Sequence, residues 1–217
     1  PTPTPKPTPT PTKAPSDIAR LESLCGHSVD VIKGFVNIRT LDPSIIIDMR
    51  YAGPNNVTGK AIYSANVCVL LPKTAEKILK VQAELAKKGY CLKIWDAYRP
   101  VSDHEMLQEV ITDPRYVAAD ESKHCKGLAV DVTMTDPDGI EVEMPSGFDD
   151  FTGKGSRDTS KMTKKAAANL KILTDAMTKN GFLIYTHEWW HFYLPKSYGT
   201  KNYDYDLAET FPDWEIT

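Results

Sequence analysis

Residues 187–191 read His-Glu-Trp-Trp-His and so match the pattern H-E-x-x-H. On a helix, the two histidines of this pattern lie on one face and bind a zinc ion, with the glutamate as general base. The surrounding stretch 182–194 is instead rich in aromatic residues, poor in strong helix formers, and bounded by a glycine and a proline. This composition predicts a strand. Residues four apart in a strand are separated by about 13 Å, so His187 and His191 cannot both reach one zinc ion. Alternation along the strand places on one face Trp189, His191 and Tyr193, with Glu188 where the chain enters the strand.

A metal bound by His191 needs further ligands, and the stretch 122–131 contains two candidates. His124 precedes a glycine turn, and Asp131 stands between two valines in an apolar run. Burial of an ionised carboxylate without a cation costs considerable free energy. A single histidine or strand aspartate is usually structural, but both together with the Glu188/His191 pair favour a metal site.

The four cysteines are Cys25, Cys68, Cys91 and Cys125. They allow three disulfide connectivities if the protein is exported. Cys68 and Cys91 lie in apolar, strand-like runs, which favours the interpretation of small buried thiols. Cys125 is adjacent to His124, and thiolate is a good zinc ligand. In an extended segment, however, neighbouring side chains point in opposite directions, so we expect Cys125 to point away from the metal.

Hydrophobic periodicity predicts the helices and strands that position these residues. Residues 73–88, which end at a glycine, and residues 160–179, which end at Asn-Gly, predict amphipathic helices. Short runs rich in β-branched and aromatic residues predict strands at 90–98, 127–134 and 187–194. The apolar face of the first helix is expected to comprise Ala75, Ile78, Leu79, Leu85 and Ala86. This order predicts an α+β fold, with a central antiparallel or mixed sheet and helices packed against it.

The composition excludes several classes of protein. The chain has 217 residues, of which 41% are hydrophobic and 25% charged, so it is long enough for one sizeable core. A formal net charge of -3 provides no basic surface for nucleic acid. No apolar run is long enough to span a membrane. We therefore expect a small or peptidic substrate.

Residues 1–15 alternate mainly proline and threonine and contain almost nothing apolar to bury. This composition predicts an extended, polyproline-like linker followed by one catalytic domain at residues 16–217. At about 3.1 Å per residue, the linker would hold the domain roughly 45 Å from another module or an anchor. Linkers of this type commonly join secreted modules, so we expect a secreted or cell-envelope-associated protein.

Two separated motifs together resemble the zinc D-Ala-D-Ala peptidases. The first runs through Ser122, His124, Gly127, Ala129 and Asp131, and the second is Glu-Trp-Trp-His at 188–191. The family includes the D-alanyl-D-alanine dipeptidases of the vancomycin-resistance type, related D,D-carboxypeptidases and, more distantly, the hedgehog signalling domains. Three further stretches are similar to the dipeptidase branch, namely RYAGPNNVTGK at 50–60, WDAYRP at 95–100 and MPSGFDDF at 144–151. The resemblance extends from about Asp42 to Tyr193.

The resemblance implies a role for each matched residue. It makes His124, Asp131 and His191 the ligands of one zinc ion per chain, with a fourth position for water. Glu188 matches the general base, and Arg99 matches the arginine that stabilises the oxyanion. Ser122 and Asp149 match residues that receive the free amino group of the substrate. The neighbouring Asp150 could share or take over that task.

These observations predict a zinc-dependent dipeptidase that hydrolyses D-Ala-D-Ala or a similar dipeptide by attack of a zinc-bound water. One alternative keeps the chemistry and changes the substrate, as in a D,D-carboxypeptidase or endopeptidase acting on peptidoglycan stem peptides. A second alternative is a zinc-stabilised binding module without turnover. The presence of both Glu188 and Arg99 argues against the binding module.

Overall fold

The protein is described by a computed structural model at residues 16–117 and 122–216. The predicted linker at residues 1–15 lies outside this part of the chain. Within it, the larger sheet has the strand order β3-β5-β6-β8-β7. These strands are β3 (Ile46–Ile47), β5 (Cys91–Asp96), β6 (Ala129–Thr135), β7 (Leu183–Ile184) and β8 (His191–Tyr193). β3 runs parallel to β5 and the other pairs are antiparallel, so the predicted mixed sheet of an α+β fold is confirmed.

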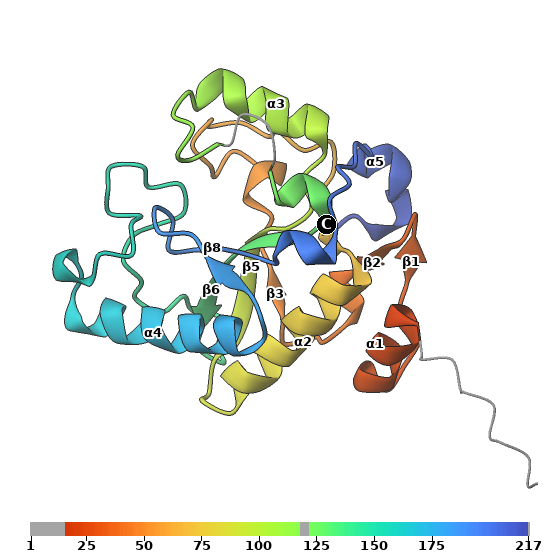
Figure 1. The fold of residues 1–217 in the computed structure, drawn as a ribbon, viewed down its shortest axis with the longest axis horizontal. Coiled ribbons are helices and arrows are strands. Elements are labelled where there is room, and N and C mark those ends of the chain that lie inside the picture. Colours follow the sequence, from red (N-terminus) through yellow and green to blue (C-terminus); the bar gives the residue numbers. More distant parts are fainter. Residues whose placement is uncertain (1–15, 118–121, 217) are drawn as a thin grey trace, which may run out of the picture.

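A smaller antiparallel sheet has the order β1-β2-β4, with strands β1 (Val31–Ile32), β2 (Phe35–Asn37) and β4 (Val69–Leu70). The helices are α1 (Asp17–Cys25), α2 (Pro72–Ala86), α3 (Val101–Val110), α4 (Lys164–Lys179) and α5 (Leu207–Thr210). Helices α2 and α4 pack against each other, α2 also against β5 and α4 against β7, whereas α3 lies at the far end of the molecule (Figure 1). None of the helices in the described residues is long and apolar enough to cross a lipid bilayer.

Both helices predicted from periodicity are present, with shifted boundaries. Helix α2 begins at Pro72, because proline suits the first helical turn. Helix α4 begins only after Thr163, whose side chain accepts a hydrogen bond from the backbone N–H of Ala166, so the predicted start at residue 160 was too early. On the buried face of α2, the predicted Leu79 is only partly buried and Ala86 is exposed. The positions buried there are Thr74, Ala75, Ile78, Val81, Gln82 and Leu85.

The stretch 182–194 is not the single strand that its composition predicts. It forms a hairpin in which β7 pairs with β8, with Leu183 opposite Tyr193 and Ile184 opposite Phe192. Residues 185–190 connect the two strands, and at their end the carbonyl of Trp190 accepts a hydrogen bond from the backbone N–H of Val132 on β6 at 3.0 Å. The backbone N–H of Trp189 donates to the carbonyl of Gly155 at 2.7 Å instead of to a strand neighbour.

The hairpin changes the predicted grouping of side chains. Trp189 is fully buried in the connecting loop and packs edge-on against Trp95, so it does not share a strand face with His191. His191 and Tyr193 do lie on the same face of β8, and their ring centroids are 5.8 Å apart. Glu188 lies in the loop and not at a strand end. The prediction that this stretch is not helical is confirmed.

The four cysteines are all free. Cys68 is buried, as expected, and burial raises the pKa of its thiol. Cys91 is only partly buried. Cys125 is buried, but it lies in a short 3₁₀ helix, His124–Lys126, and not in the extended segment that we expected.

Candidate active site

The two sheet-borne residues of the candidate metal site face each other across neighbouring strands. Strand β6 is buried at every position. Asp131 lies in the middle of it and pairs in register with His191 on β8. Paired residues of antiparallel strands project from the same face of the sheet. The register of one strand pair therefore brings together side chains that are 60 residues apart in the sequence.

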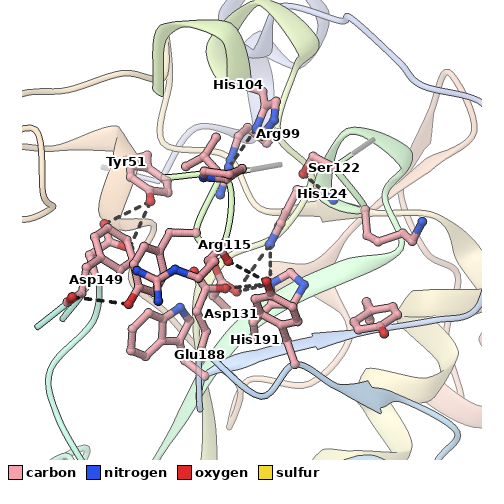
Figure 2. Close-up of a pocket in the computed structure, with 18 residues that line it drawn as sticks. Tyr51, Arg99, His104, Arg115, Ser122, His124, Asp131, Asp149, Glu188 and His191 are labelled. Carbon is pink, nitrogen blue, oxygen red and sulfur yellow. Dashed lines mark hydrogen bonds and ion pairs between the residues drawn. The ribbon is translucent and has the colours of Figure 1, made fainter. Parts of the chain in front are cut away.

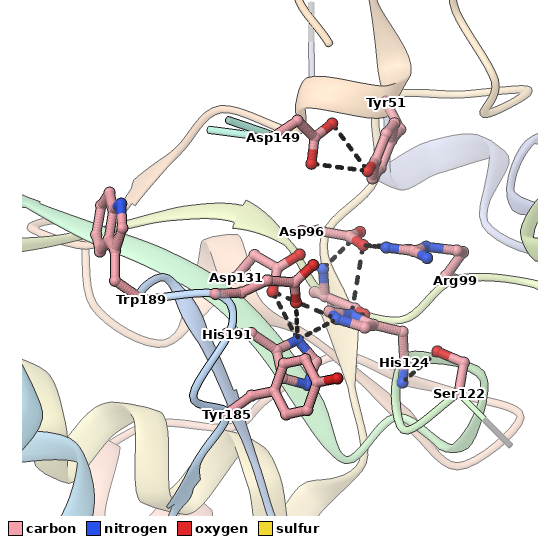
Figure 3. A network of polar contacts seen from close by, with 12 residues as sticks. Tyr51, Asp96, Arg99, Ser122, His124, Asp131, Asp149, Tyr185, Trp189 and His191 are labelled. Atoms are coloured by element: carbon pink, nitrogen blue, oxygen red, sulfur yellow. Dashed lines mark hydrogen bonds and ion pairs between the residues drawn. The ribbon is translucent and has the colours of Figure 1, made fainter. Parts of the chain in front are cut away.

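His124 reaches the same place from the turn that precedes β6. The 3₁₀ helix that carries it ends at Gly127, whose φ is 62°. A Cβ atom at this position would come within 2.9 Å of the Phe35 ring, so both the backbone conformation and the packing require glycine. The turn directs the imidazole of His124 toward Asp131 and His191 (Figure 3).

The distances between the three side chains fit a metal site. Nδ1 of His191 lies 2.9 Å from Oδ1 of Asp131 and 3.1 Å from Nε2 of His124. Nε2 of His124 and Oδ1 of Asp131 are 3.4 Å apart. Two ligands of a tetrahedral zinc ion, at bond lengths near 2 Å, are separated by about 3.3 Å. Among the described residues, this is the group of histidine, cysteine and acidic side chains whose ligand atoms lie close enough to bind one ion.

The protonation of His124 supports the same assignment. Its Nδ1 lies 2.7 Å from the carbonyl oxygen of Ala97, which can only accept a hydrogen bond. The proton is therefore on Nδ1, and Nε2 presents a lone pair to the other two side chains. His187 and Cys125 lie outside the group, as the sequence predicts.

Neighbouring carboxylates and burial raise the pKa of two acidic side chains at the cavity, Glu188 and Asp149. Burial and the charges of Asp131 and Asp149 raise the pKa of Glu188 well above its usual range. Burial and the charge of Asp131 raise the pKa of Asp149 to about 7. Burial also opposes ionisation of Asp131, but the neighbouring His124 and His191 hold its pKa far below normal. A divalent cation and an ammonium group would offset the negative charge of these carboxylates.

Glu188 lies beside the candidate metal ligands. Its Oε2 atom is 3.9 Å from Nδ1 of His191, and its side chain points into the cavity (Figure 2). Glu188 is buried, with 7% of the residue exposed, and it belongs to the lining of the cavity. Next to it, the buried indole of Trp189 donates to Oγ of Ser146 at 3.0 Å and anchors the loop.

Arg99 follows β5 and lines the cavity from the other side. Its Nε and Nη2 atoms donate to Oδ2 of Asp96 at 3.2 and 2.6 Å. Its guanidinium carbon lies 5.0 Å from the centroid of the Tyr51 ring. Nη1 lies 3.2 Å from Nδ1 of His104. These contacts fix the plane of the guanidinium at the cavity wall.

Asp96 was missed by the sequence-based reasoning, although a signal was present. It is fully buried, binds Arg99 and lies 3.3 Å from Nδ1 of His124. It also accepts a hydrogen bond from the hydroxyl of Tyr63. One carboxylate thus supports both a candidate ligand and the candidate oxyanion-stabilising arginine. An aspartate at the end of an apolar strand carries the same signal that identified Asp131.

The structure separates the two aspartates that the sequence left open. Asp149 lines the cavity, and the hydroxyl of Tyr51 donates to both of its carboxylate oxygens, at 3.0 and 3.2 Å. Asp150 lies outside the cavity lining, and its Oδ1 accepts hydrogen bonds from Thr152. Ser122 lines the cavity, and its Oγ accepts from the backbone N–H of His124 at 3.2 Å.

The cavity has a volume of about 240 Å³. This is below the range of about 300–1,000 Å³ that is usual for ligand pockets. Part of its wall is the segment 114–117, which contacts neighbouring segments. The rings of Tyr116 and Phe151 stack with centroids 4.3 Å apart, and the hydroxyl of Tyr185 donates to the carbonyl of Arg115 at 2.7 Å. The aromatic lining comprises Tyr51, Tyr116, Phe151, Tyr185, Trp190 and Tyr193.

Comparison with known proteins places most of the chain in one family. The sequence model of the D-ala-D-ala dipeptidase family matches residues 32–215. The D-alanyl-D-alanine dipeptidase of Escherichia coli is 36% identical over 165 residues, which cover 75% of this chain and 85% of that protein. A D-alanyl-D-alanine dipeptidase of Enterococcus faecium is 29% identical over 194 residues, covering 76% of this chain and 96% of the relative. One of Enterococcus faecalis is 30% identical over 185 residues, with coverage of 74% and 91%.

Proposed function

Because the chain belongs to the D-Ala-D-Ala dipeptidase family, we propose that it is a zinc-dependent dipeptidase that hydrolyses D-Ala-D-Ala or a closely similar dipeptide. Family membership makes it a hydrolytic metallopeptidase. The observation that supports the finer proposal is one small cavity lined by a three-ligand metal group, the buried Glu188 and the buried Asp149.

His124, Asp131 and His191 would hold the metal. Two imidazoles and one carboxylate are a ligand set that suits zinc, and three protein ligands are typical of catalytic zinc sites. When bound, zinc polarises a carbonyl group and makes water acidic enough to ionise near neutral pH.

The proton transfer is assigned to Glu188. Its carboxylate accepts the proton of the attacking water and then donates it to the amine that leaves. The position of its Oε2 beside His191 supports this role, because a general base must lie within reach of the water that attacks the peptide.

Arg99 is assigned to the oxyanion. Its guanidinium is held at the cavity wall by Asp96 and by the ring of Tyr51. Negative charge develops on the peptide oxygen when water adds to the carbonyl. A fixed donor aimed at such an oxygen lowers the barrier by about 3–4 kcal/mol.

Asp149 and Ser122 are assigned to the free amino group of the substrate. The carboxylate of Asp149 is fixed by Tyr51 and provides the counter-charge that a buried ammonium requires. A stem peptide has an amide in place of this ammonium, so it would leave the carboxylate of Asp149 without a positively charged partner from the substrate. Together with the small volume of the cavity, this favours a dipeptide over a longer peptide.

Comparison of four substrates tests the proposal. The zinc-loaded protein is incubated with D-Ala-D-Ala, L-Ala-L-Ala, N-acetyl-D-Ala-D-Ala and a stem pentapeptide that ends in D-Ala-D-Ala, and released alanine is measured. We expect cleavage of the first substrate only. The acetylated dipeptide is the matched control, because it differs only in the amino group. Rapid cleavage of the acetylated dipeptide or the pentapeptide would indicate a carboxypeptidase. Retention of zinc without any hydrolysis would indicate a binding module.

Export of the protein stays a prediction. It rests on the proline- and threonine-rich composition of residues 1–15, which lie outside the described part of the chain. Fractionation of the producing cells, followed by detection of the protein with an antibody, distinguishes an envelope or secreted location from a cytoplasmic one.

A further inference from the structure

The loop that carries Glu188 is held by one arginine on a different segment. Nε of Arg157 donates to the carbonyl of Tyr185 at 2.9 Å, and Nη2 donates to the carbonyl of Trp189 at 2.6 Å. The backbone N–H of Arg157 donates to the carbonyl of Thr186 at 3.1 Å. The bonded carbonyls lie on both sides of Glu188 in the sequence.

Arg157 is itself anchored to the rigid part of the fold. Its Nη1 donates to Oγ1 of Thr174 on α4 at 2.9 Å. Its guanidinium carbon lies 4.5 Å from the centroid of the Phe192 ring on β8. The arginine therefore connects the loop to a helix and to the strand that carries His191.

The positively charged guanidinium of Arg157 donates its hydrogen bonds mainly to the carbonyls of Tyr185 and Trp189. Burial lowers its pKa to about 10, so the guanidinium stays positive at neutral pH. Within residues 16–117 and 122–216, no carboxylate forms an ion pair with the guanidinium, which donates to two carbonyls and a hydroxyl. Hydrogen bonds from a charged donor are stronger than neutral ones, and the planar fork fixes their directions.

The segment that precedes Arg157 also packs against the loop. The carbonyl of Gly155 accepts a hydrogen bond from the backbone N–H of Trp189 at 2.7 Å. A Cβ atom on Gly155 would come within 2.9 Å of the Trp190 ring and within 2.6 Å of the carbonyl oxygen of Asp150. The close approach of Gly155 places the guanidinium of Arg157 next to the loop.

We propose that Arg157 is the positioning residue for Glu188. Arg157 sets the conformation of loop 185–190 and thereby directs the carboxylate of Glu188 into the cavity. This inference rests on the proposed role of Glu188 as general base. Arg157 does not line the cavity, so it acts through Glu188 and not on the substrate. Residues 185–190 lie between the strands of the hairpin, outside the residue pairs of β7 and β8. Their conformation depends on contacts such as those of Arg157.

Replacement of Arg157 tests this role. Arg157→Met removes the donors and keeps an apolar side chain of similar length. We expect kcat for D-Ala-D-Ala to fall about 100-fold, because a misplacement of about 1 Å has an effect of this size. KM and zinc content should be nearly unchanged, since Asp149 and the metal ligands are held by other contacts. Arg157→Lys keeps the charge but loses the fork, and should restore part of kcat.

A double-mutant cycle with Glu188 separates positioning from general damage. In a Glu188→Ala background, Arg157→Met should change the residual kcat by less than about threefold, because the base that it positions is absent. Leu173→Ala is the control: this residue is fully buried on α4, so its truncation lowers thermal stability, and it should leave kcat per zinc-bound molecule unchanged.

The outcomes distinguish the inference from the proposed function. A Glu188→Ala variant that binds zinc and retains near-normal kcat would remove the proposed base itself. If that variant is inactive but Arg157→Met has normal kcat, the positioning role is wrong and the proposed function stands. An equal loss from Arg157→Met in both backgrounds, or an equal loss of kcat in Leu173→Ala, would also refute the positioning role.

Discussion

Replacement of Asp149 by asparagine should have opposite effects on activity and on stability. The substitution removes the charge and nearly preserves the shape of the side chain. A hydrogen bond to a charged group contributes about 1.5–3 kcal/mol, so its loss should lower kcat/KM by about 10- to 150-fold. The ammonium group is bound in both the ground state and the transition state. The defect should therefore appear mainly as a higher KM, with kcat nearly unchanged.

The effect on stability follows from the raised pKa of Asp149, which is about 7 in the folded, metal-free protein. The corresponding value in an unfolded chain is about 3.9. Because the folded state holds the proton more tightly, the carboxyl group stabilises the fold below about pH 4, and this contribution is lost as the pH rises to about 7. The difference corresponds to at most about 4 kcal/mol at 1.36 kcal/mol per pKa unit. Asparagine does not ionise, so the metal-free variant should be more stable than wild type at pH 8 and similar to it at pH 4.

Two measurements on the same preparations test this reasoning. Initial rates with D-Ala-D-Ala at pH 8 give kcat and KM of the zinc-loaded proteins. Urea unfolding of the zinc-free proteins at pH 4 and pH 8 gives the free energies of unfolding. Asp150→Asn is the matched control, because Asp150 bonds to Thr152 and lies outside the cavity lining. An unchanged KM in Asp149→Asn, or a larger rise of KM in Asp150→Asn, would refute the assignment of Asp149 to the substrate amine.

Two further predictions concern the metal and the oxyanion. Alanine at His124, Asp131 or His191 should remove zinc and activity together. His187→Ala should keep zinc, because His187 lies outside the ligand group. Atomic absorption and kcat, measured on the same samples, check both expectations. Loss of zinc in His187→Ala alone would contradict the assignment. Arg99→Ala should retain zinc and lower kcat by about 100- to 1,000-fold, and Arg99→Lys should recover only part of this, because lysine lacks the planar fork. Equal kcat values for the lysine variant and wild type would show that any positive charge at this position suffices.

Local patterns predicted the helices with one apolar face and the strands with a dense apolar run. Helices α2 and α4 each present one apolar face, and strands β5 and β6 are dense in branched and aromatic residues. Helix α3 was missed, because its ten residues are mostly polar and follow a proline. The hairpin at residues 182–194 was also missed. Aromatic residues continue through its loop, because Trp189 and Trp190 pack inside the molecule although they do not lie in a strand.

Some residues of the candidate site could be predicted from the sequence and others could not. The types and order of His124, Asp131, Glu188 and His191 are visible in the sequence, because buried carboxylates and paired histidines are rare without a function. Asp96, Tyr51 and Arg157 were not assigned roles. Asp96 and Tyr51 bond to other side chains and Arg157 bonds to backbone carbonyls of the loop, and these contacts join residues 3–98 positions apart.

The sequence by itself determined the α+β class, the family and the set of residues able to bind a metal, since these depend on residue type and short-range order. Only the tertiary structure decided which of the two aspartates faces the cavity, and how the loop with Glu188 is held. Those outcomes depend on the register of β6 against β8, on the left-handed conformation of Asp149 (φ 55°) and on the hydrogen bonds of Arg157. The strand register and the hydrogen bonds of Arg157 join distant segments, so their free energy exists only after the chain has folded, and the surrounding fold holds Asp149 in its left-handed conformation.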